Sequence, residues 1–229
     1  MSFSSQVKEE LLRIHPEKHC CMLSELSALT QACASLRLAG GGRLRVVYAV
    51  ESVPLAKRIF LLLKKRLEIT PVLEFSRQKR LGGRRVCLLT VGEADGRRLL
   101  LALRMLREGP EGAVYRGVPR AVTTRRCCRA AFVRGAFLGA GAVTAPEKGY
   151  HLEFRASDNR ADTLLNILEK SGISASVAQR RGDEIVYMKR GDDVAACLAL
   201  MGAHGALLEM ENMRITRESR SQANRARNC

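Results

Sequence analysis

Two pairs of adjacent cysteines, Cys20-Cys21 and Cys127-Cys128, are the first residues of this chain whose type and spacing could do chemistry. Thiolates bind zinc, but the C-x2-C spacing typical of structural zinc sites occurs nowhere in the sequence. The four histidines form no spaced cluster that could complete such a site. We therefore interpret the pairs as buried small thiols and predict no metal site and no cofactor.

Positive charge is the second feature with chemical meaning. The chain has 39 Lys and Arg against 23 Asp and Glu, a formal net charge of +16. An excess of this size predicts a polyanionic partner: DNA, RNA or an anionic membrane face. Aromatic residues make up only 4% and Trp is missing, which argues against a stacking platform for single strands. We expect double-stranded DNA as the partner, with protein partners in transcription also open, and no small-molecule substrate.

Apolar runs in this sequence are short. The N-terminal stretch is too charged for a signal peptide, and the run 59–63 falls far below the roughly 20 residues of a membrane span. We therefore expect no membrane association, a cytoplasmic and nucleoid-associated protein, and reduced cysteines.

Gly135 and Gly139 lie four residues apart in a segment, 127–143, that has a helical apolar period and no proline. Glycine inside a helix costs roughly 1 kcal/mol against alanine, so this pair needs a reason. A similar segment upstream carries Ala28 and Ala32 at the matching places. We infer two copies of one unit, with two helices packed through their small faces at a pseudo-two-fold axis.

The fold class expected from this repeat is α+β, with the order αβαββα occurring twice and mixed or antiparallel sheets. A helix at 4–14, capped by Ser4 or Ser5, comes before both units. In the first unit we expect helices at 20–36, 54–67 and 95–106, a strand at 43–51, and a hairpin of 71–76 with 84–91. In the second we expect helices at 127–143, 158–171 and 192–201, a strand at 150–156, and a hairpin of 174–180 with 184–190.

The expected domain division follows the same elements. It comprises an N-terminal helix (1–19), the first repeat (20–108), a linker (109–126), the second repeat (127–203), and a C-terminal helix or linker (204–229).

This pattern resembles the LAGLIDADG homing-endonuclease fold, with the ten-residue motif falling on 26–35 and 133–142. Longer stretches are more specific: FSSQVKEEL, CCRAAFVRGAFLGAGAV with EKGYHLEF, and GAHGALLEMENMR followed by RSQANRARNC. They are similar to the WhiA family, bacterial regulators of sporulation and cell division with a degenerate form of this fold. The resemblance covers nearly all of the chain. It implies a further C-terminal helix-turn-helix domain, which we expect to be missing here.

The resemblance also implies which chemistry has been lost. Active LAGLIDADG enzymes place an acid near the end of each motif, and the two carboxylates hold the Mg²⁺ ions used in hydrolysis. The matching residues are Cys33 and Ala140, and neither offers an oxygen ligand. Glu25 and Glu51 do not form a symmetric pair in the repeat. The expected function is a non-enzymatic DNA-binding transcriptional regulator, with no catalytic residue.

In the nuclease fold the open faces of the two sheets form a saddle over the duplex. If that geometry survives, strand alternation selects Arg43, Arg45 and Arg155 for DNA contacts. The expected hairpin contacts to flanking phosphates are Arg77, Lys79, Arg80, Arg84, Arg85, Arg180, Arg181, Lys189 and Arg190. Most such contacts would go to the DNA backbone and carry little sequence information. The opposing interpretation is that these side chains are simply solvated.

Two alternative functions stay open: a scaffold domain whose ligand is protein, and a metal-dependent homing endonuclease. Duplex binding across salt concentrations separates the regulator from the scaffold, because phosphate contacts make affinity strongly dependent on salt. Plasmid nicking with Mg²⁺ or Mn²⁺ tests the nuclease.

Overall fold

The computed structural model describes residues 1–229 except 40–42, 78–84, 110–111, 116, 118–119, 157–160 and 228–229. The chain opens with α1 (Phe3–Arg13), whose N-cap is Ser2. The Ser2 hydroxyl accepts a hydrogen bond from the Ser5 backbone N–H at 3.2 Å. The predicted caps, Ser4 or Ser5, were therefore wrong by two or three residues, because the helix already begins at Phe3, the first residue of its apolar stripe.

Two units of the same design follow. The first comprises α2 (His19–Cys33), β1 (Ala34–Ala39), β2 (Arg43–Val50), α3 (Val53–Leu67), β3 (Val72–Arg77), β4 (Arg85–Val91) and α4 (Glu93–Ala102). The second comprises α5 (Arg126–Ala140), β7 (Gly141–Val143), β8 (Leu152–Ala156), α6 (Ala161–Glu169), β9 (Ser176–Arg180), β10 (Asp183–Met188) and α7 (Gly191–Met201). The strand orders are β1-β2-β4-β3 and β7-β8-β10-β9, so the sheets repeat the same topology.

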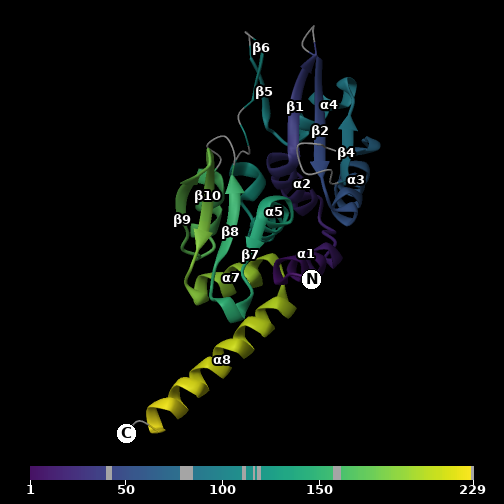
Figure 1. Ribbon diagram of the computed structural model, residues 1–229. Helices are drawn as coiled ribbons and strands as arrows, with labels where there is room; N and C mark the ends of the chain where they lie inside the picture. The colour runs from purple at the N-terminus through teal and green to yellow at the C-terminus, as the bar shows by residue number, and fades with distance from the viewer. Residues whose placement is uncertain are drawn as a thin grey trace.

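The two sheets are antiparallel throughout and flank a central pair of helices, α2 and α5 (Figure 1). This arrangement confirms the predicted fold class and the internal repeat. Each unit has one strand more than the αβαββα order, because β1 and β7 directly follow the central helices. The helices predicted at 20–36 and 127–143 were thus too long, since pairing with β2 and β8 extends the backbone after Cys33 and Ala140.

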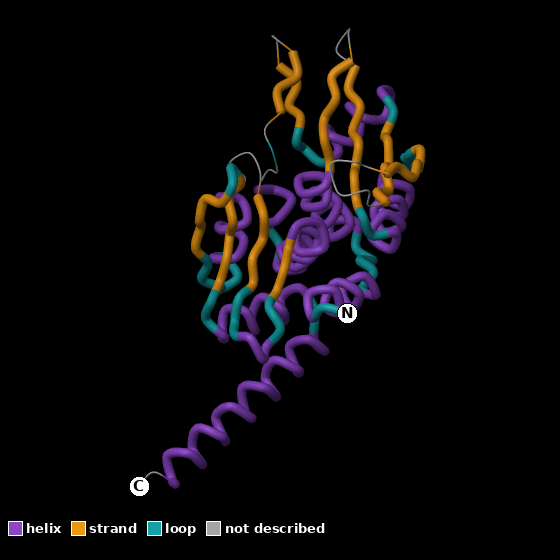
Figure 2. Tube along the Cα trace, viewed as in Figure 1, coloured by secondary structure: helices purple, strands orange, loops and turns teal. Residues whose placement is uncertain are grey.

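The segment between the units contains further elements. A small hairpin of β5 (Leu106–Gly109) and β6 (Gly112–Tyr115) rises between the two sheets, and a 3-10 helix (Arg120–Thr123) comes before α5 (Figure 2). α4 ends at Ala102, so the helix predicted at 95–106 was too long, because Leu103 and Arg104 form a turn and Leu106 begins β5. Another 3-10 helix (Pro146–Lys148) lies between β7 and β8.

Close packing of α2 on α5 explains the two helical glycines. A Cβ on Gly135 would lie 2.6 Å from the Glu25 carbonyl oxygen, and one on Gly139 would lie 2.6 Å from the Ala32 Cβ. Side chains at either position would need the helices to separate. The predicted contact between the small faces is therefore confirmed.

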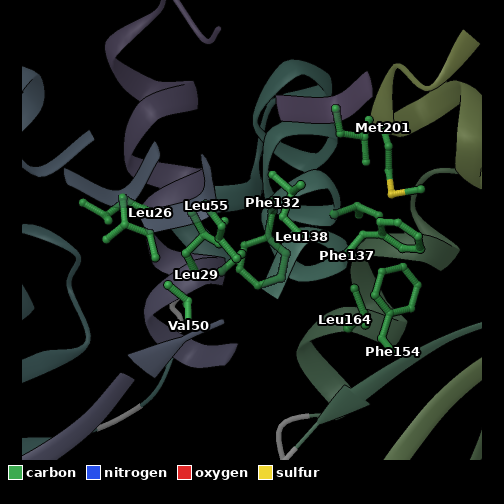
Figure 3. Close-up of a cluster of buried hydrophobic side chains, with 14 of the residues drawn as sticks. Leu26, Leu29, Val50, Leu55, Phe132, Phe137, Leu138, Phe154, Leu164 and Met201 are labelled. Atoms are coloured by element: carbon green, nitrogen blue, oxygen red, sulfur yellow. The ribbon is translucent and has the colours of Figure 1, made fainter. Parts of the chain in front are cut away.

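Large apolar side chains surround this helix crossing and join both units in one core. Leu26 and Leu29 of α2 belong to the same buried cluster as Phe132 of α5, and Phe137 packs edge-on against Phe154 of β8 at a centroid distance of 6.1 Å (Figure 3). Every second residue of β2 and β8 points to the covered face of its sheet and adds to this core, as strand alternation predicts.

The last element is α8 (His204–Arg227), which extends away from the body (Figure 1). The Glu10 carboxylate of α1 accepts hydrogen bonds from the backbone N–H groups of Gly205 and Ala206 at 2.7 and 3.1 Å. A side chain of the first helix thereby caps the last one. Among the described helices, every one is too short or too polar to cross a membrane.

Candidate nucleic-acid interface

Each four-stranded sheet has one face against the helices and one open face. In the first sheet the open face carries a shallow hollow, lined by Arg37, Arg45, Val47, Val72, Glu74, Leu88, Thr90, Gly92 and Glu93. In the second sheet the register places Glu153, Arg155, Ala178, Arg180, Ile185 and Tyr187 on the open face. We call these surfaces the first and second open faces.

Arg43 and Arg45 of β2 are exposed, as the alternation predicts. Both already have a partner, because Glu93 at the start of α4 holds Arg43 at 3.3 Å and Arg45 at 3.1 Å. The Arg43 and Arg45 side chains remain 64% and 55% exposed. Ion pairs this exposed contribute roughly 0–1 kcal/mol, so a phosphate could replace the carboxylate at small cost.

Arg37 is a residue of this face that the sequence analysis missed. It is exposed on β1 and lies directly across from Arg45 in the strand register. The signal was present, because Leu36 and Leu38 alternate with Ser35 and Arg37 just before a glycine run. Assigning this stretch to the preceding helix concealed it.

Arg155 of β8 and Arg180 of β9 share the second open face. Arg155 makes an ion pair of 3.6 Å with Asp183, and its side chain is 68% exposed. The second open face therefore repeats the pattern of the first: basic side chains on the strands, loosely held by one neighbouring carboxylate.

The other predicted hairpin residues do not form one group. Lys79, Arg80 and Arg84 lie outside the described residues, and of Arg77 only the backbone, at the end of β3, is described. Arg85 is exposed, but it lies on the same side of β4 as Cys87 and Leu89, which belong to the covered face. The sheet register thus keeps Arg85 off the first open face.

In the second unit the remaining basic residues divide between the two ends of the hairpin. Arg181 occupies the turn in a left-handed conformation. Lys189 lies at the far end, its ammonium 5.3 Å from the centre of the Tyr187 ring. Arg190 is the N-cap of α7 and pairs with Asp193 at 3.6 Å. Of these three residues, Lys189 adjoins the second open face, because its ammonium lies close to Tyr187, a residue of that face.

The helix ends that carry acids in active LAGLIDADG enzymes carry none here. Cys33 and Ala140 are the last residues of α2 and α5. Burial raises the pKa of the Cys33 thiol to about 12, against the opposing charge of Lys8. A neutral thiol and a methyl group give a hard cation no oxygen ligand at this position.

Glu25 is also unavailable to a metal. Its carboxylate is fully buried and accepts hydrogen bonds from Arg58 Nε at 2.7 Å and Arg134 Nε at 2.9 Å. Arg58 also donates to the Ile14 carbonyl, and Arg134 donates to the Met201 carbonyl at 3.2 Å. Glu25 therefore acts as a structural ion-pair centre between the units.

One group of candidate soft-metal ligands lies at the opposite end of the two central helices. The Sγ atoms of Cys20, Cys21, Cys127 and Cys128 all lie within 4.8 Å of one another. Cys21 and Cys128 are buried, and Cys20 and Cys127 are half-buried. The interpretation as separate buried thiols was incomplete, because the helix pairing brings the two pairs together.

Sequence comparisons match both units to described domains. Residues 19–106 match the WhiA N-terminal LAGLIDADG-like domain, and residues 129–220 match the WhiA LAGLIDADG-like domain. The whole chain is 37% identical over 233 residues to a protein of Alkaliphilus metalliredigens named "Probable cell division protein WhiA", covering 73% of it. A protein of the same name from Heliobacterium modesticaldum is 38% identical over 230 residues, and 72% of it is covered.

Solved structures show the same fold. Full-length DUF199/WhiA from Thermatoga maritima superposes with a TM-score of 0.73 at 20% identity, covering 99% of this chain and 74% of that one. The homing endonuclease I-DmoI, solved in complex with DNA and Mn, superposes with a TM-score of 0.55 at 15% identity, covering 80% of this chain and 97% of that one.

Proposed function

The chain belongs to the WhiA family, and from this premise we propose that it is a non-enzymatic, DNA-binding transcriptional regulator of cell division and sporulation. The relatives matched above are named as cell division proteins. In this role the chain binds the phosphate backbone of the DNA duplex near the genes that it regulates.

The observation that carries the proposal is the presence of exposed arginines on both open faces. Arg37 and Arg45 lie on the first open face, and Arg155 and Arg180 lie on the second. Guanidinium groups bind phosphate oxygens in a bidentate way, and the net charge of +16 favours a polyanion at long range. The fold neighbour I-DmoI was solved with DNA, which supports a duplex as the partner.

Loss of hydrolysis follows from the residues at the helix ends. Phosphodiester cleavage of the LAGLIDADG kind needs a carboxylate from each helix to position metal ions and the attacking water. Cys33 and Ala140 cannot supply these ligands, and Glu25, two turns before Cys33 on α2, is held by two arginines. We infer binding without cutting.

A direct experiment measures binding of the purified chain to a fluorescent duplex over a range of KCl concentrations. Neutralising roughly five to eight phosphates predicts a slope of log K against log salt of about −4.5 to −7. Supercoiled plasmid incubated with the chain and Mg²⁺ or Mn²⁺ should stay intact. Binding with a slope near zero, or none at low salt, contradicts DNA binding, and nicking contradicts the non-enzymatic role.

An interaction domain for protein is the second candidate. Val72 and Phe75 on the edge strand β3 are 61% and 66% exposed, and an edge strand offers unpaired backbone groups to a partner. The duplex experiment separates the two functions, since a pure scaffold would bind no DNA at low salt. If the duplex binds, the edge strand can still serve partner proteins in transcription.

A further inference from the structure

The first turns of the two central helices meet, and each brings a pair of cysteines. Cys20 and Cys21 belong to the first turn of α2, and Cys127 and Cys128 to the first turn of α5. The Ser24 hydroxyl donates to the Cys128 carbonyl at 2.6 Å, which holds the two turns together. The four Sγ atoms consequently lie within 4.8 Å of one another.

We propose that Cys20, Cys21, Cys127 and Cys128 form a tetrathiolate site for one Zn²⁺ ion that joins the two units. With Zn–S bonds of about 2.3 Å, a tetrahedron separates its sulfurs by about 3.8 Å. All four sulfurs lie within 4.8 Å of one another, so no pair exceeds this spacing by more than about 1 Å. Small rotations of the two cysteine side chains on each helix would bring the sulfurs to the tetrahedral spacing.

Adjacent cysteines looked unsuitable in the sequence because one pair alone cannot surround a metal ion. Neighbouring side chains of a helix point about 100° apart, so each pair can supply two ligands on one side of a metal ion. The second side comes from the other helix, which the small faces of Gly135 and Gly139 allow to approach closely. The repeat that creates the helix crossing also completes the ligand set.

The helix ends and the neighbouring cations stabilise negative charge at the four sulfurs, whereas burial raises the pKa of the Cys21 and Cys128 thiols to about 12, so a metal ion is needed to displace their protons. Both pairs lie at helix N-termini, where free backbone N–H groups and the helix dipole stabilise negative charge. Lys18 and Arg125 are the N-cap residues of α2 and α5, and Arg126 follows directly. Four thiolates and one Zn²⁺ carry a net charge of −2, which these cations offset, and binding releases the four thiol protons to solvent.

The site is structural in kind. Four protein ligands fill the tetrahedral shell of zinc and leave no position for water or substrate. Because two ligands come from each unit, the ion would oppose separation of the units at the end of the helix pair away from Cys33 and Ala140. This role is independent of DNA binding.

The test measures metal content in the full chain, purified under reducing conditions from cells supplied with zinc. We expect about one zinc per chain by mass spectrometry. Replacement by Co²⁺ should give the intense visible absorption of a tetrahedral cobalt tetrathiolate. A zinc chelator should lower the melting temperature, and Zn²⁺ but not Mg²⁺ should restore it.

Paired variants locate the ion. Cys20→Ser with Cys127→Ser removes one ligand from each helix and should abolish zinc retention. Cys33→Ala, a cysteine change at the other end of α2, should retain one zinc. If the double variant fails to fold, the cobalt spectrum and chelation of the unaltered chain decide the matter.

Four outcomes would overturn the proposal. They are reduced full chain with no zinc and no cobalt–thiolate absorption, zinc retained by the double variant, iron and sulfide in place of zinc, or cysteines found as disulfides despite the reductant.

Discussion

Arg134 on α5 places its Nε 2.9 Å from Oε2 of Glu25 on α2, although the two residues are 109 positions apart in the sequence. Arg58 of α3 holds the other carboxylate oxygen at 2.7 Å. All three side chains are buried, so one acid joins three helices from both units. The group carries a net charge of +1, and the buried Arg134 has its counter-charge only when the two units are assembled.

Replacing Glu25 by Gln should lower the free energy of unfolding by about 3–5 kcal/mol, because two arginines would be left buried without a counter-charge. Urea unfolding measures the change. Replacing the three residues together by Glu25→Leu, Arg58→Met and Arg134→Met should recover most of the loss, since no charge then stays buried. A small effect of Glu25→Gln alone would contradict the buried ion-pair assignment.

Gly139→Leu should destabilise the helix crossing by about 1–3 kcal/mol or more, because the new side chain must displace Ala32 and Cys33. Thermal or urea unfolding measures this. Gly139→Ala should also destabilise the protein despite the better helix propensity of alanine. In the control Gly92→Ala the added Cβ meets nothing within 4 Å, so its effect, about 1 kcal/mol or less, comes from the N-cap position of Gly92 in α4 and not from overpacking.

Glu93→Gln should strengthen duplex binding, because the carboxylate that Arg43 and Arg45 share, and that competes with phosphate, would be lost. We expect an affinity gain of severalfold at low salt and a smaller gain at high salt. Glu169→Gln makes the same change of charge at the exposed end of α6, behind the second sheet. Equal gains from both variants would mean that net charge alone is responsible.

Stability should decrease above about pH 8.5, and Cys197 should contribute to the decrease. Burial raises the pKa of its thiol well above the ordinary value. Since the unfolded chain ionises this thiol near pH 8.5 and the folded chain does not, stability is lost as pH rises between the two pKa values. In Cys197→Ala the decrease between pH 9 and 10.5 should be shallower, by up to about 1.4 kcal/mol per pH unit. Urea unfolding at several pH values measures it, and parallel curves would contradict the assignment.

Three features could be predicted from the sequence: the repeat, the small helix faces, and the outward direction of Arg43, Arg45 and Arg155. They depend on glycine positions and on the periodicity of apolar residues in helices and strands. β1 was missed because a short strand that continues directly from a helix gives no turn signal. With it, Arg37 was missed as well.

Contacts between residues that lie far apart in the sequence could not be predicted in the same way. The contact of Glu25 with Arg134 and the meeting of Cys20 with Cys127 both depend on how α2 crosses α5. No local pattern encodes that crossing geometry. The repeat indicated that the helices pair, and their relative position had to come from the structure.

The most direct test of the DNA interface compares salt slopes of duplex binding for two double variants of the full chain. Arg45→Ala with Arg155→Ala removes one arginine from each open face, and Lys65→Ala with Lys170→Ala removes two exposed cations behind the sheets. We predict that the first variant reduces the steepness of log K against log salt by about 1.8 and that the second leaves it unchanged. Equal changes in both variants, or a larger change in the second, would contradict the assignment of the open faces to DNA.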